Sequence, residues 1–399
     1  MVFSAQALSL DNAFHPEGRG GITCLRLQDF RSYQSLRLIC DPRPVVLTGS
    51  NGAGKTNILE ALSFLTPGRG LRAQKLSQVL RRAERTETPA WYVSVDVFTS
   101  IEEETITLGT GYEASLESGR EKRIVKVAGE LTKSQSALSD YISVNWLTPQ
   151  MDGLFQDNAS ERRKFLDRLI CAFDEEHASR IYRYEYALRE RSRLLRQGIR
   201  DPHWFNALEE TMASSGTAIA YARQEAVAWL SRATDWALGV FPQAELRLEG
   251  SMDVWMQSGV SALEVEERLK NSLERSRAYD AEYGSAQEGC HRTDLIATYK
   301  EKNMLASNCS TGEQKALLLS LVMASIRVQS THQKVVSVVL LDEVVAHLDE
   351  ERRKALYEEI KNLKTQVWMT GTDYMTFAPL QDDAQYFMVE NSHINSQDR

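Results

Sequence analysis

The chain has 399 residues, of which 42% are hydrophobic and 26% are charged, with a formal net charge of -8 at pH 7. This length allows a large buried core, and we expect two domains. The negative balance argues against a protein that coats nucleic acid indiscriminately, but it does not exclude a local basic patch. Five cysteines without a C-x-x-C pair indicate neither a disulfide framework nor a zinc site, and they fit a cytoplasmic protein. The first twenty residues indicate no signal peptide, and no apolar run is long enough to span a bilayer, so we expect no membrane partner.

The first predicted elements are strands that lead into a glycine-rich turn. Segment 22–47 predicts strands and a turn, ending in a buried strand, Val45-Val46-Leu47. The apolar residues of 58–65 fall on one face of a helix, which Pro67 and Gly68 should end. Beyond it, 91–127 contains three alternating segments, which predict either a small antiparallel sheet or the edge strands of one larger sheet.

The middle of the chain differs from the preceding segments in composition and in predicted secondary structure. From about residue 160 to residue 277, long charged stretches with few glycines predict a helical insertion, broken near 198–202 and 239–259. This insertion is too short and too interrupted for a long continuous coiled coil. Strands are again predicted from Gly289 onward, among them a strongly apolar strand at 335–341.

One motif matches the phosphate-binding loop G-x-x-x-x-G-K-[ST] between a predicted strand and a predicted helix, as that motif requires. Its glycines let backbone N–H groups converge on phosphate oxygens at the positive end of the helix. We expect Lys55 to reach the β- and γ-phosphates of ATP and Thr56 to ligate Mg²⁺. A plain glycine-rich turn is the alternative. The predicted nucleotide-binding residues of this loop are Gly49, Ser50, Asn51, Gly52, Ala53, Gly54, Lys55 and Thr56.

A second motif is the apolar strand 338–341, which ends in two carboxylates. At the carboxyl end of the strand Asp342 can hold Mg²⁺, and Glu343 can orient the water that attacks the γ-phosphate. Lys55 and Glu343 are therefore the predicted catalytic residues. A strand that stops at a solvated acidic turn is the alternative interpretation.

A third motif, Ser310-Thr311-Gly312-Glu313-Gln314, precedes an apolar helix and resembles the signature motif of ABC ATPases. Ser310 and Gly312 at a helix N-terminus would form a second anion site, although a simple N-cap is the alternative. If both sites bind one nucleotide, two copies must face each other head to tail with ATP between them.

Three weaker signals complete the site. Asp349 occupies the position of the loop that follows the acidic strand in such ATPases, and Gln150 is a candidate magnesium sensor. The histidine of transporter ATPases is missing, because Gly371-Thr372-Asp373 stands in its place. A hydroxyl or carboxylate sensor predicts slow hydrolysis. Together the motifs predict an α/β fold: an ABC-type P-loop ATPase head, with a mixed sheet around the P-loop helix plus antiparallel strands, and a helical arm domain. We place the head at 1–148 and 289–399 and the arm at 149–288.

Four separate segments resemble the bacterial RecF family in order and spacing. They are L-R-L-Q-D-F-R-S-Y at 25–33, W-L-T-P-Q-M at 146–151, G-C-H-R-T-D-L at 289–295 and C-S-T-G-E-Q-K-A-L-L at 309–318. The distance from Thr56 to Ser310 is also too long for a transporter ATPase and too short for a cohesin-like protein. The chain departs from the family pattern at Cys290, where we expect proline.

The resemblance implies a protein of DNA repair and replication restart that dimerises on ATP and binds DNA near single-strand gaps. It also implies that RecR and RecO act with the chain to help RecA load, and that Arg31 and Ser32 lie near the nucleotide. Two other classes stay open: a soluble ATPase subunit of a transporter or another SMC-like clamp ATPase, and a non-catalytic module with a vestigial pocket. Glu343 argues against the vestigial pocket. Stimulation of ATP turnover by DNA would separate the DNA repair protein from the transporter subunit.

Two basic patches are candidates for DNA contact. The first is a stripe in the insertion, and the second is the pair Arg69 and Arg72 beyond the P-loop helix. A phosphate backbone could follow the stripe, but a solvated face with pairs such as Glu185 and Arg189 explains it equally well. The stripe consists of Arg189, Arg193, Arg196 and Arg200.

Overall fold

The computed structural model describes residues 19–81, 90–100, 103–114, 121–132, 134–199, 201–235, 240–330, 335–363 and 365–396. Residues 1–18, in which we expect no signal peptide, lie outside these ranges. Arg200 of the basic stripe lies outside them as well. Within the described ranges, no helix combines the length and apolarity needed to cross a membrane.

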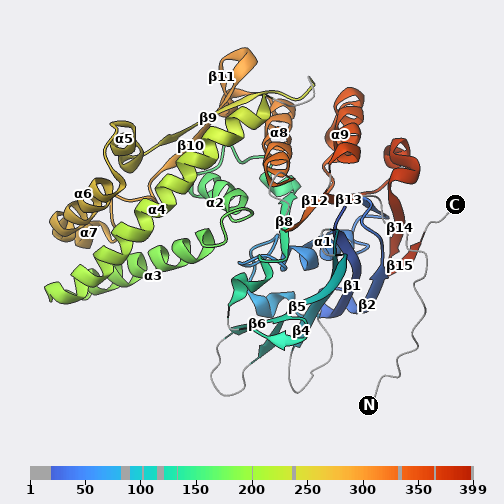
Figure 1. Cartoon of the computed structure of the whole chain (residues 1–399), viewed down its shortest axis with the longest axis horizontal. Coiled ribbons are helices and arrows are strands. Elements are labelled where there is room, and N and C mark those ends of the chain that lie inside the picture. The colour runs from blue at the N-terminus through green and yellow to red at the C-terminus, as the bar shows by residue number, and fades with distance from the viewer. Residues whose placement is uncertain are drawn as a thin grey trace.

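A six-stranded, mostly parallel sheet forms the centre of the head (Figure 1). Its inner strands are buried on both faces, as parallel strands covered on two sides must be. The strand order places β13 between the P-loop strand β3 and the acidic strand β12, so the carboxyl ends of all three meet at one edge. In spatial order the strands are β15 (His393–Ser396), β14 (Gln385–Glu390), β3 (Val45–Thr48), β13 (Gln366–Gly371), β12 (Val336–Leu341) and β8 (Ile142–Leu147).

The two faces of this sheet bury different layers. Val46, Val339 and Met369 point into a core shared with α8 (Thr311–Ser330) and α9 (Glu350–Asn362). Val45 and Leu340 point into a second core shared with α1 (Lys55–Ser63) and an antiparallel sheet. Alternation along each strand therefore fixes which layer covers which face. The P-loop helix α1 ends at Ser63, before Pro67 and Gly68, which were expected to end it.

The second sheet is antiparallel and has six strands. The three segments of 91–127 form antiparallel strands as predicted, but their sheet is not small, because β1 and β2 belong to it as well. Phe30, Phe64 and Trp91 pack edge to face or tilted at its centre, with centroid separations of 5.0 to 6.0 Å. The strands in order are β2 (Tyr33–Ile39), β1 (Gly21–Phe30), β4 (Ala90–Thr99), β5 (Glu104–Ala114), β6 (Glu121–Val127) and β7 (Glu130–Leu131).

The predicted insertion forms an arm that extends to one side of the head (Figure 1). The predicted break near 198–202 separates α3 from α4, where Asp201 caps α4 and Pro202 occupies its first turn. The second break, 239–259, was predicted without a strand, yet it contains β9 (Ala244–Glu249), which pairs with β10 (Asp294–Tyr299) and through it with β11 (Met304–Leu305). The helices are α2 (Ala159–Ile170), α3 (His177–Arg196), α4 (Pro202–Thr234), α5 (Ser251–Gln257), α6 (Ala262–Arg275) and α7 (Arg277–Tyr283).

Packing divides the arm between two cores. Helix α2 and the second half of α4 bury Leu166, Leu169 and Leu230 in the same core as α8. The outer arm has its own cluster, in which Tyr184, Met212 and Leu269 join α3, α4 and α6. The long helix α4 therefore belongs to both cores and connects the outer arm to the head. The boundaries at 148/149 and 288/289 stay a prediction.

A half-buried histidine, His291, joins the outer arm to the segment around 290. The Tyr184 hydroxyl donates to His291 Nδ1 at 2.7 Å, because Nε2 carries the proton that is donated to the Ala286 carbonyl at 2.9 Å. Burial lowers the pKa of His291 to about 4, and nearby arginines add to this effect. These arginines are Arg292, Arg163 and Arg223.

This histidine predicts a loss of stability in mild acid. The unfolded chain binds the proton near the ordinary pKa of 6.5, whereas the folded chain resists protonation down to about 4. The free energy of unfolding should therefore fall by up to about 3 kcal/mol between those pH values, and this contribution should level off below them. Urea midpoints measured at pH 7.5, 5.5 and 4.5 should decline less steeply for His291→Gln than for the native chain. Equal slopes would contradict this assignment.

Candidate functional site

The P-loop is a tight turn that only glycine can make at two positions. Gly49 and Gly54 have φ values of 143° and 116°, in a region that other residues rarely adopt. A side chain at Gly49 would collide with the Val389 carbonyl, and one at Gly54 would meet the Tyr33 hydroxyl. Tyr33 in turn donates to the Gly54 carbonyl at 3.2 Å. Val389 of β14 and Tyr33 of β2 therefore hold the loop in this shape.

The loop ends at an uncapped helix N-terminus. Gly54 provides no side-chain cap for α1, and the first turn of α1 carries no acid. The first N–H groups of a helix have no partner within the helix and attract anions. Lys55 is 4% exposed, and its Nζ donates to the carbonyls of Gly49 at 2.6 Å and Ser50 at 2.9 Å. A triphosphate fits this cradle, because it would supply the anionic partner for both the N–H groups and the ammonium.

Burial lowers the pKa of Lys55, and the two carboxylates at the end of β12 oppose that effect. The Thr56 hydroxyl lies 3.0 and 3.1 Å from the two carboxylate oxygens of Asp342. Hydroxyl and carboxylate oxygens are the ligands that Mg²⁺ prefers, so this pair fits the ion. The structure therefore brings Asp342 to Lys55 and Thr56, although Asp342 lies 286 residues beyond Thr56 in the sequence.

Thr370 is a site residue that the sequence did not reveal. It is buried near the end of β13, donates to Asp342 Oδ1 at 2.8 Å and accepts from the Glu343 backbone N–H at 2.9 Å. This hydroxyl fixes both acidic residues. The signal available in the sequence was its place at the end of an apolar strand, since such strand ends converge in parallel sheets.

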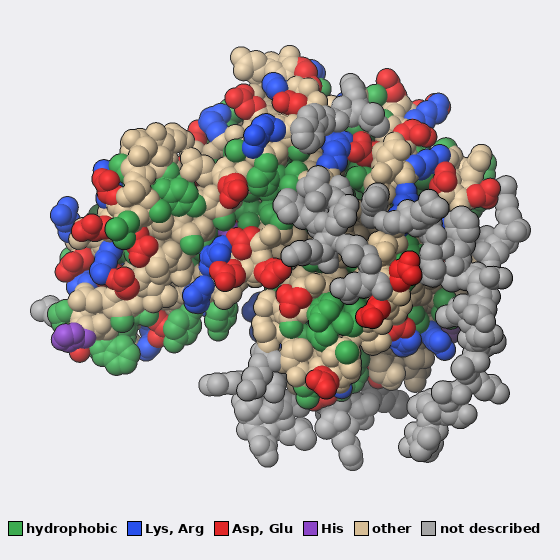
Figure 2. All heavy atoms as spheres, viewed as in Figure 1, with side chains coloured by type: hydrophobic (Ala, Val, Ile, Leu, Met, Phe, Trp, Pro, Cys, Tyr) green, Lys and Arg blue, Asp and Glu red, His purple; other side chains and the backbone are tan. Residues whose placement is uncertain are grey.

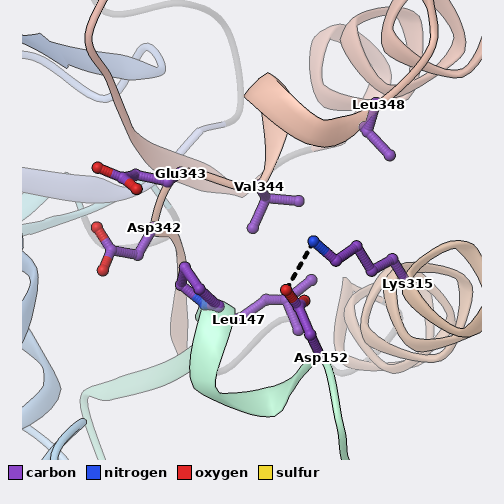
Figure 3. A pocket seen from close by; sticks show the side chains of 8 residues that line it. Leu147, Asp152, Lys315, Asp342, Glu343, Val344 and Leu348 are labelled. Carbon is purple, nitrogen blue, oxygen red and sulfur yellow. Dashed lines mark ion pairs between the residues drawn. The ribbon is translucent and has the colours of Figure 1, made fainter. Parts of the chain in front are cut away.

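Glu343 has a φ of 54°, a left-handed conformation that is uncommon for a residue other than glycine. Backbone strain of this kind often marks a functional position. The carboxylates of Asp342 and Glu343 point to the same side of the strand end, away from Lys315 (Figure 3). Two carboxylates on one side of the end of β12 suit a metal ligand next to a water-orienting group.

A small pocket lies behind these carboxylates (Figure 3). Lys315 of α8 enters it and pairs with Asp152 at 2.7 Å. Asp152 follows the short 3-10 turn Pro149–Met151, whose Gln150 is exposed. The turn is anchored near the acidic strand, because the Asp342 N–H donates to the Leu147 carbonyl at 2.9 Å. The predicted role of Gln150 as a magnesium sensor remains a prediction.

The signature segment is exposed at the start of α8. The Ser310 backbone N–H and hydroxyl each donate to Glu313 Oε2 at 2.8 Å. A hydrogen-bonded pair with Lys302, followed by the Ser310 contacts, lowers the pKa of Glu313 to about 2. Asp349 is likewise exposed and caps α9 by accepting from the Arg352 N–H at 2.8 Å. Around Gly312 the space is open.

Arg31 and Ser32 lie beside the P-loop helix. The Ser32 hydroxyl accepts from Asn57 Nδ2 at 3.0 Å, one residue beyond Thr56. Arg31 and Arg72 both pair at 2.5 Å with Glu60, a buried residue of α1. These arginines therefore hold α1 in place in this state. A role for Arg72 in DNA contact remains a prediction, as does one for the exposed Arg69.

Thr372 and Asp373 follow β13, so they lie at the edge where the P-loop and the acidic strand meet. The Asp373 side chain accepts from the Met375 N–H at 2.9 Å and caps the 3-10 helix Tyr374–Asp383. The expected sensor position is thus occupied by a carboxylate with a capping role.

Comparisons with known proteins agree with this geometry. The family described as RecF/RecN/SMC N terminal domain matches residues 21–395. DNA replication and repair protein RecF of Allorhizobium ampelinum is 43% identical over 94% of this chain and 98% of the relative, and that of Rhizobium meliloti is 42% identical over the same shares.

Solved structures share the fold. Recombination mediator protein RecF-ATPrS in the RecFOR pathway superposes with a TM-score of 0.80 at 22% identity, covering 96% of this chain and 100% of that one. The corresponding RecF-ATP structure gives 0.78 at 22% identity, covering 95% and 99%. With its relatives aligned over nearly their whole length, the chain belongs to the RecF family of the RecF/RecN/SMC ATPases.

Proposed function

We propose that the chain is an ATP-dependent DNA-binding protein of recombinational repair and replication restart that acts at single-strand gaps. ATP binding closes a homodimer, and slow hydrolysis that depends on Glu343 reopens it. The observation that carries this proposal is the convergence of Lys55, Thr56 and Asp342 at one sheet edge, beside a fixed Glu343. Family membership supplies the link to repair, because the relatives are named DNA replication and repair proteins.

Each residue of the site has a proposed part in this cycle. The N–H groups of the P-loop and Lys55 bind the phosphates. Thr56 and Asp342 would hold Mg²⁺, and the ion would neutralise negative charge on the phosphate oxygens. Glu343 orients and polarises the attacking water, while Thr370 keeps its backbone in place. A carboxylate at position 373 in place of a histidine supports slow turnover, and we propose that DNA accelerates it.

The second half of each nucleotide site comes from another copy of the chain. Ser310, Gly312 and Asp349 are exposed, and they present a hydroxyl, a helix N-terminus and a carboxylate to the outside. A two-fold dimer would place these groups of one protomer over the P-loop of its partner and produce two equivalent sites.

We infer the protein partners of the chain from the pathway that is named for the similar solved structures. The neighbours belong to RecFOR, so we propose that RecR and RecO act with this chain in the cytoplasm to help RecA load. A transporter ATPase is not favoured, because the relatives named for DNA repair align over almost their whole length.

The proposed function is tested by DNA binding with and without ATP. Gapped, duplex and single-stranded DNA should be compared side by side over a salt series, since the salt dependence separates phosphate contacts from the rest. We expect gapped DNA to bind most tightly, and only when ATP and Mg²⁺ are present. Affinities that do not depend on ATP, or no binding to any DNA, would contradict the proposal.

A further inference from the structure

The outer face of α3 carries aromatic and basic side chains in one row. Tyr182 and Tyr186 are 66% and 52% exposed, although large aromatic side chains are usually buried. Arg189, Arg193 and Arg196 continue the row at helical spacing, and all three are exposed. We call these five residues the α3 stripe. Basic and hydrophobic side chains both lie along the lower edge of the arm, which is the position of α3 in Figure 1 (Figure 2).

The opposite face of α3 explains why this row is free to point outward. Tyr184, Ala187 and Arg191 are buried against the rest of the arm. Arg191 is fully enclosed, where it pairs with Glu209 at 2.9 Å and with Asp280 at 2.8 Å. Because these contacts fix the rotation of α3, they also fix which residues face solvent.

The stripe is basic in an acidic protein. Apart from the enclosed Arg191, helix α3 contains five arginines and two glutamates, whereas the whole chain has a net charge of -8. Both glutamates, Glu185 and Glu190, pair with stripe arginines, at 3.9 Å with Arg189 and at 2.6 Å with Arg193. Exposed pairs of this kind are weak, so a phosphate can replace the glutamate as partner.

We propose that the α3 stripe binds single-stranded DNA, with unpaired bases stacked on Tyr182 and Tyr186 and phosphates paired with the arginines. Aromatic rings interleaved with arginines match the two needs of single-strand binding, a stacking surface and a charge that follows the backbone. The row from Tyr182 to Arg196 is about 21 Å long, enough for several nucleotides. A protein partner would also favour Tyr and Arg, but the excess positive charge favours nucleic acid.

The inference rests on the proposed DNA binding, and it assigns binding of the unpaired strand to the α3 stripe. Its test compares the full-length chain with Tyr182→Ala/Tyr186→Ala, using a fluorescent oligothymidylate and a duplex of equal length, with ATP and Mg²⁺ present. We expect the double variant to lose single-strand affinity at least tenfold while duplex affinity changes little. Tyr182→Phe/Tyr186→Phe should retain native affinity, because stacking does not need the hydroxyl.

A matched control is available on the same arm. Tyr279 and Tyr283 are also four residues apart on a helix, and they are 50% and 62% exposed. Tyr279→Ala/Tyr283→Ala should leave single-strand binding unchanged. Equal losses in the two alanine pairs, or equal losses for duplex and single strand, would overturn the assignment.

The arginines give a second readout. Replacing Arg189, Arg193 and Arg196 with glutamine should reduce the slope of log affinity against log salt by about 2 for single-stranded DNA. An unchanged slope would contradict the proposal. If the tyrosine variant binds all DNA like the native chain but no longer binds RecR, the stripe is a protein docking surface and the inference is wrong. If the native chain itself binds no DNA, the proposed function fails first.

Discussion

Replacement of Glu343 with glutamine is expected to trap the chain as an ATP-bound dimer. Glutamine keeps the size of the side chain and can keep the Glu343 backbone bond to Thr370, but it cannot accept a proton from water. Loss of a general base of this kind lowers the rate at least about a hundredfold. Binding should survive, since Lys55, Thr56 and Asp342 are untouched.

The measurement is sedimentation with saturating ATP and Mg²⁺, together with single-turnover hydrolysis. The variant should sediment as a stable dimer, while the native chain returns to monomer as ATP is consumed. Glu225→Gln, the same change at an exposed position of α4, should behave like the native chain. A Glu343→Gln chain that stays monomeric with saturating ATP would show that nucleotide does not close the dimer.

Ser310→Arg is expected to abolish dimerisation while each protomer still binds ATP. Ser310 is exposed at the start of α8, and its Oγ donates to Glu313 within its own chain. A long cationic side chain there would fill the space that a partner's nucleotide has to enter. The fold should persist, because Ser310 is exposed at the surface.

Two readouts separate the steps. ATP affinity, measured with a fluorescent analogue at protein concentrations below dimerisation, should stay within a few fold of the native value. ATP-dependent sedimentation as a dimer should be lost. Ser258→Arg, an equal change at an exposed position of the arm, should dimerise normally. A Ser310→Arg chain that forms dimers as readily as the Ser258→Arg control would contradict the role of the signature segment.

Much of the head could be predicted, because its chemistry depends on local patterns. The P-loop motif spans eight consecutive residues and the acidic strand spans six, so Lys55, Thr56 and Asp342 could be predicted as site residues from the sequence. Their convergence follows from the parallel sheet, which brings the ends of β3 and β12 to one edge.

The missed residues act through contacts between distant segments. Thr370 is an ordinary threonine in a strand until β13 is inserted between β3 and β12. Glu60 reads as one polar position of a helix, yet it is buried between Arg31 and Arg72. Strand β9 was missed although its sequence, A-E-L-R-L-E, alternates apolar and charged residues and its burial alternates with them. Its place between helical segments hid this local pattern, and its partner β10 lies about 50 residues away.

The central claim is that one triphosphate is held by two protomers. The structure of the Glu343→Gln chain with ATP and Mg²⁺ tests it most directly. We expect a two-fold dimer in which Ser310 and the N-terminus of α8 of one protomer contact the triphosphate held by Lys55 of the other. ATP bound at Lys55 with Ser310 of every other copy remote from it would contradict the shared nucleotide site.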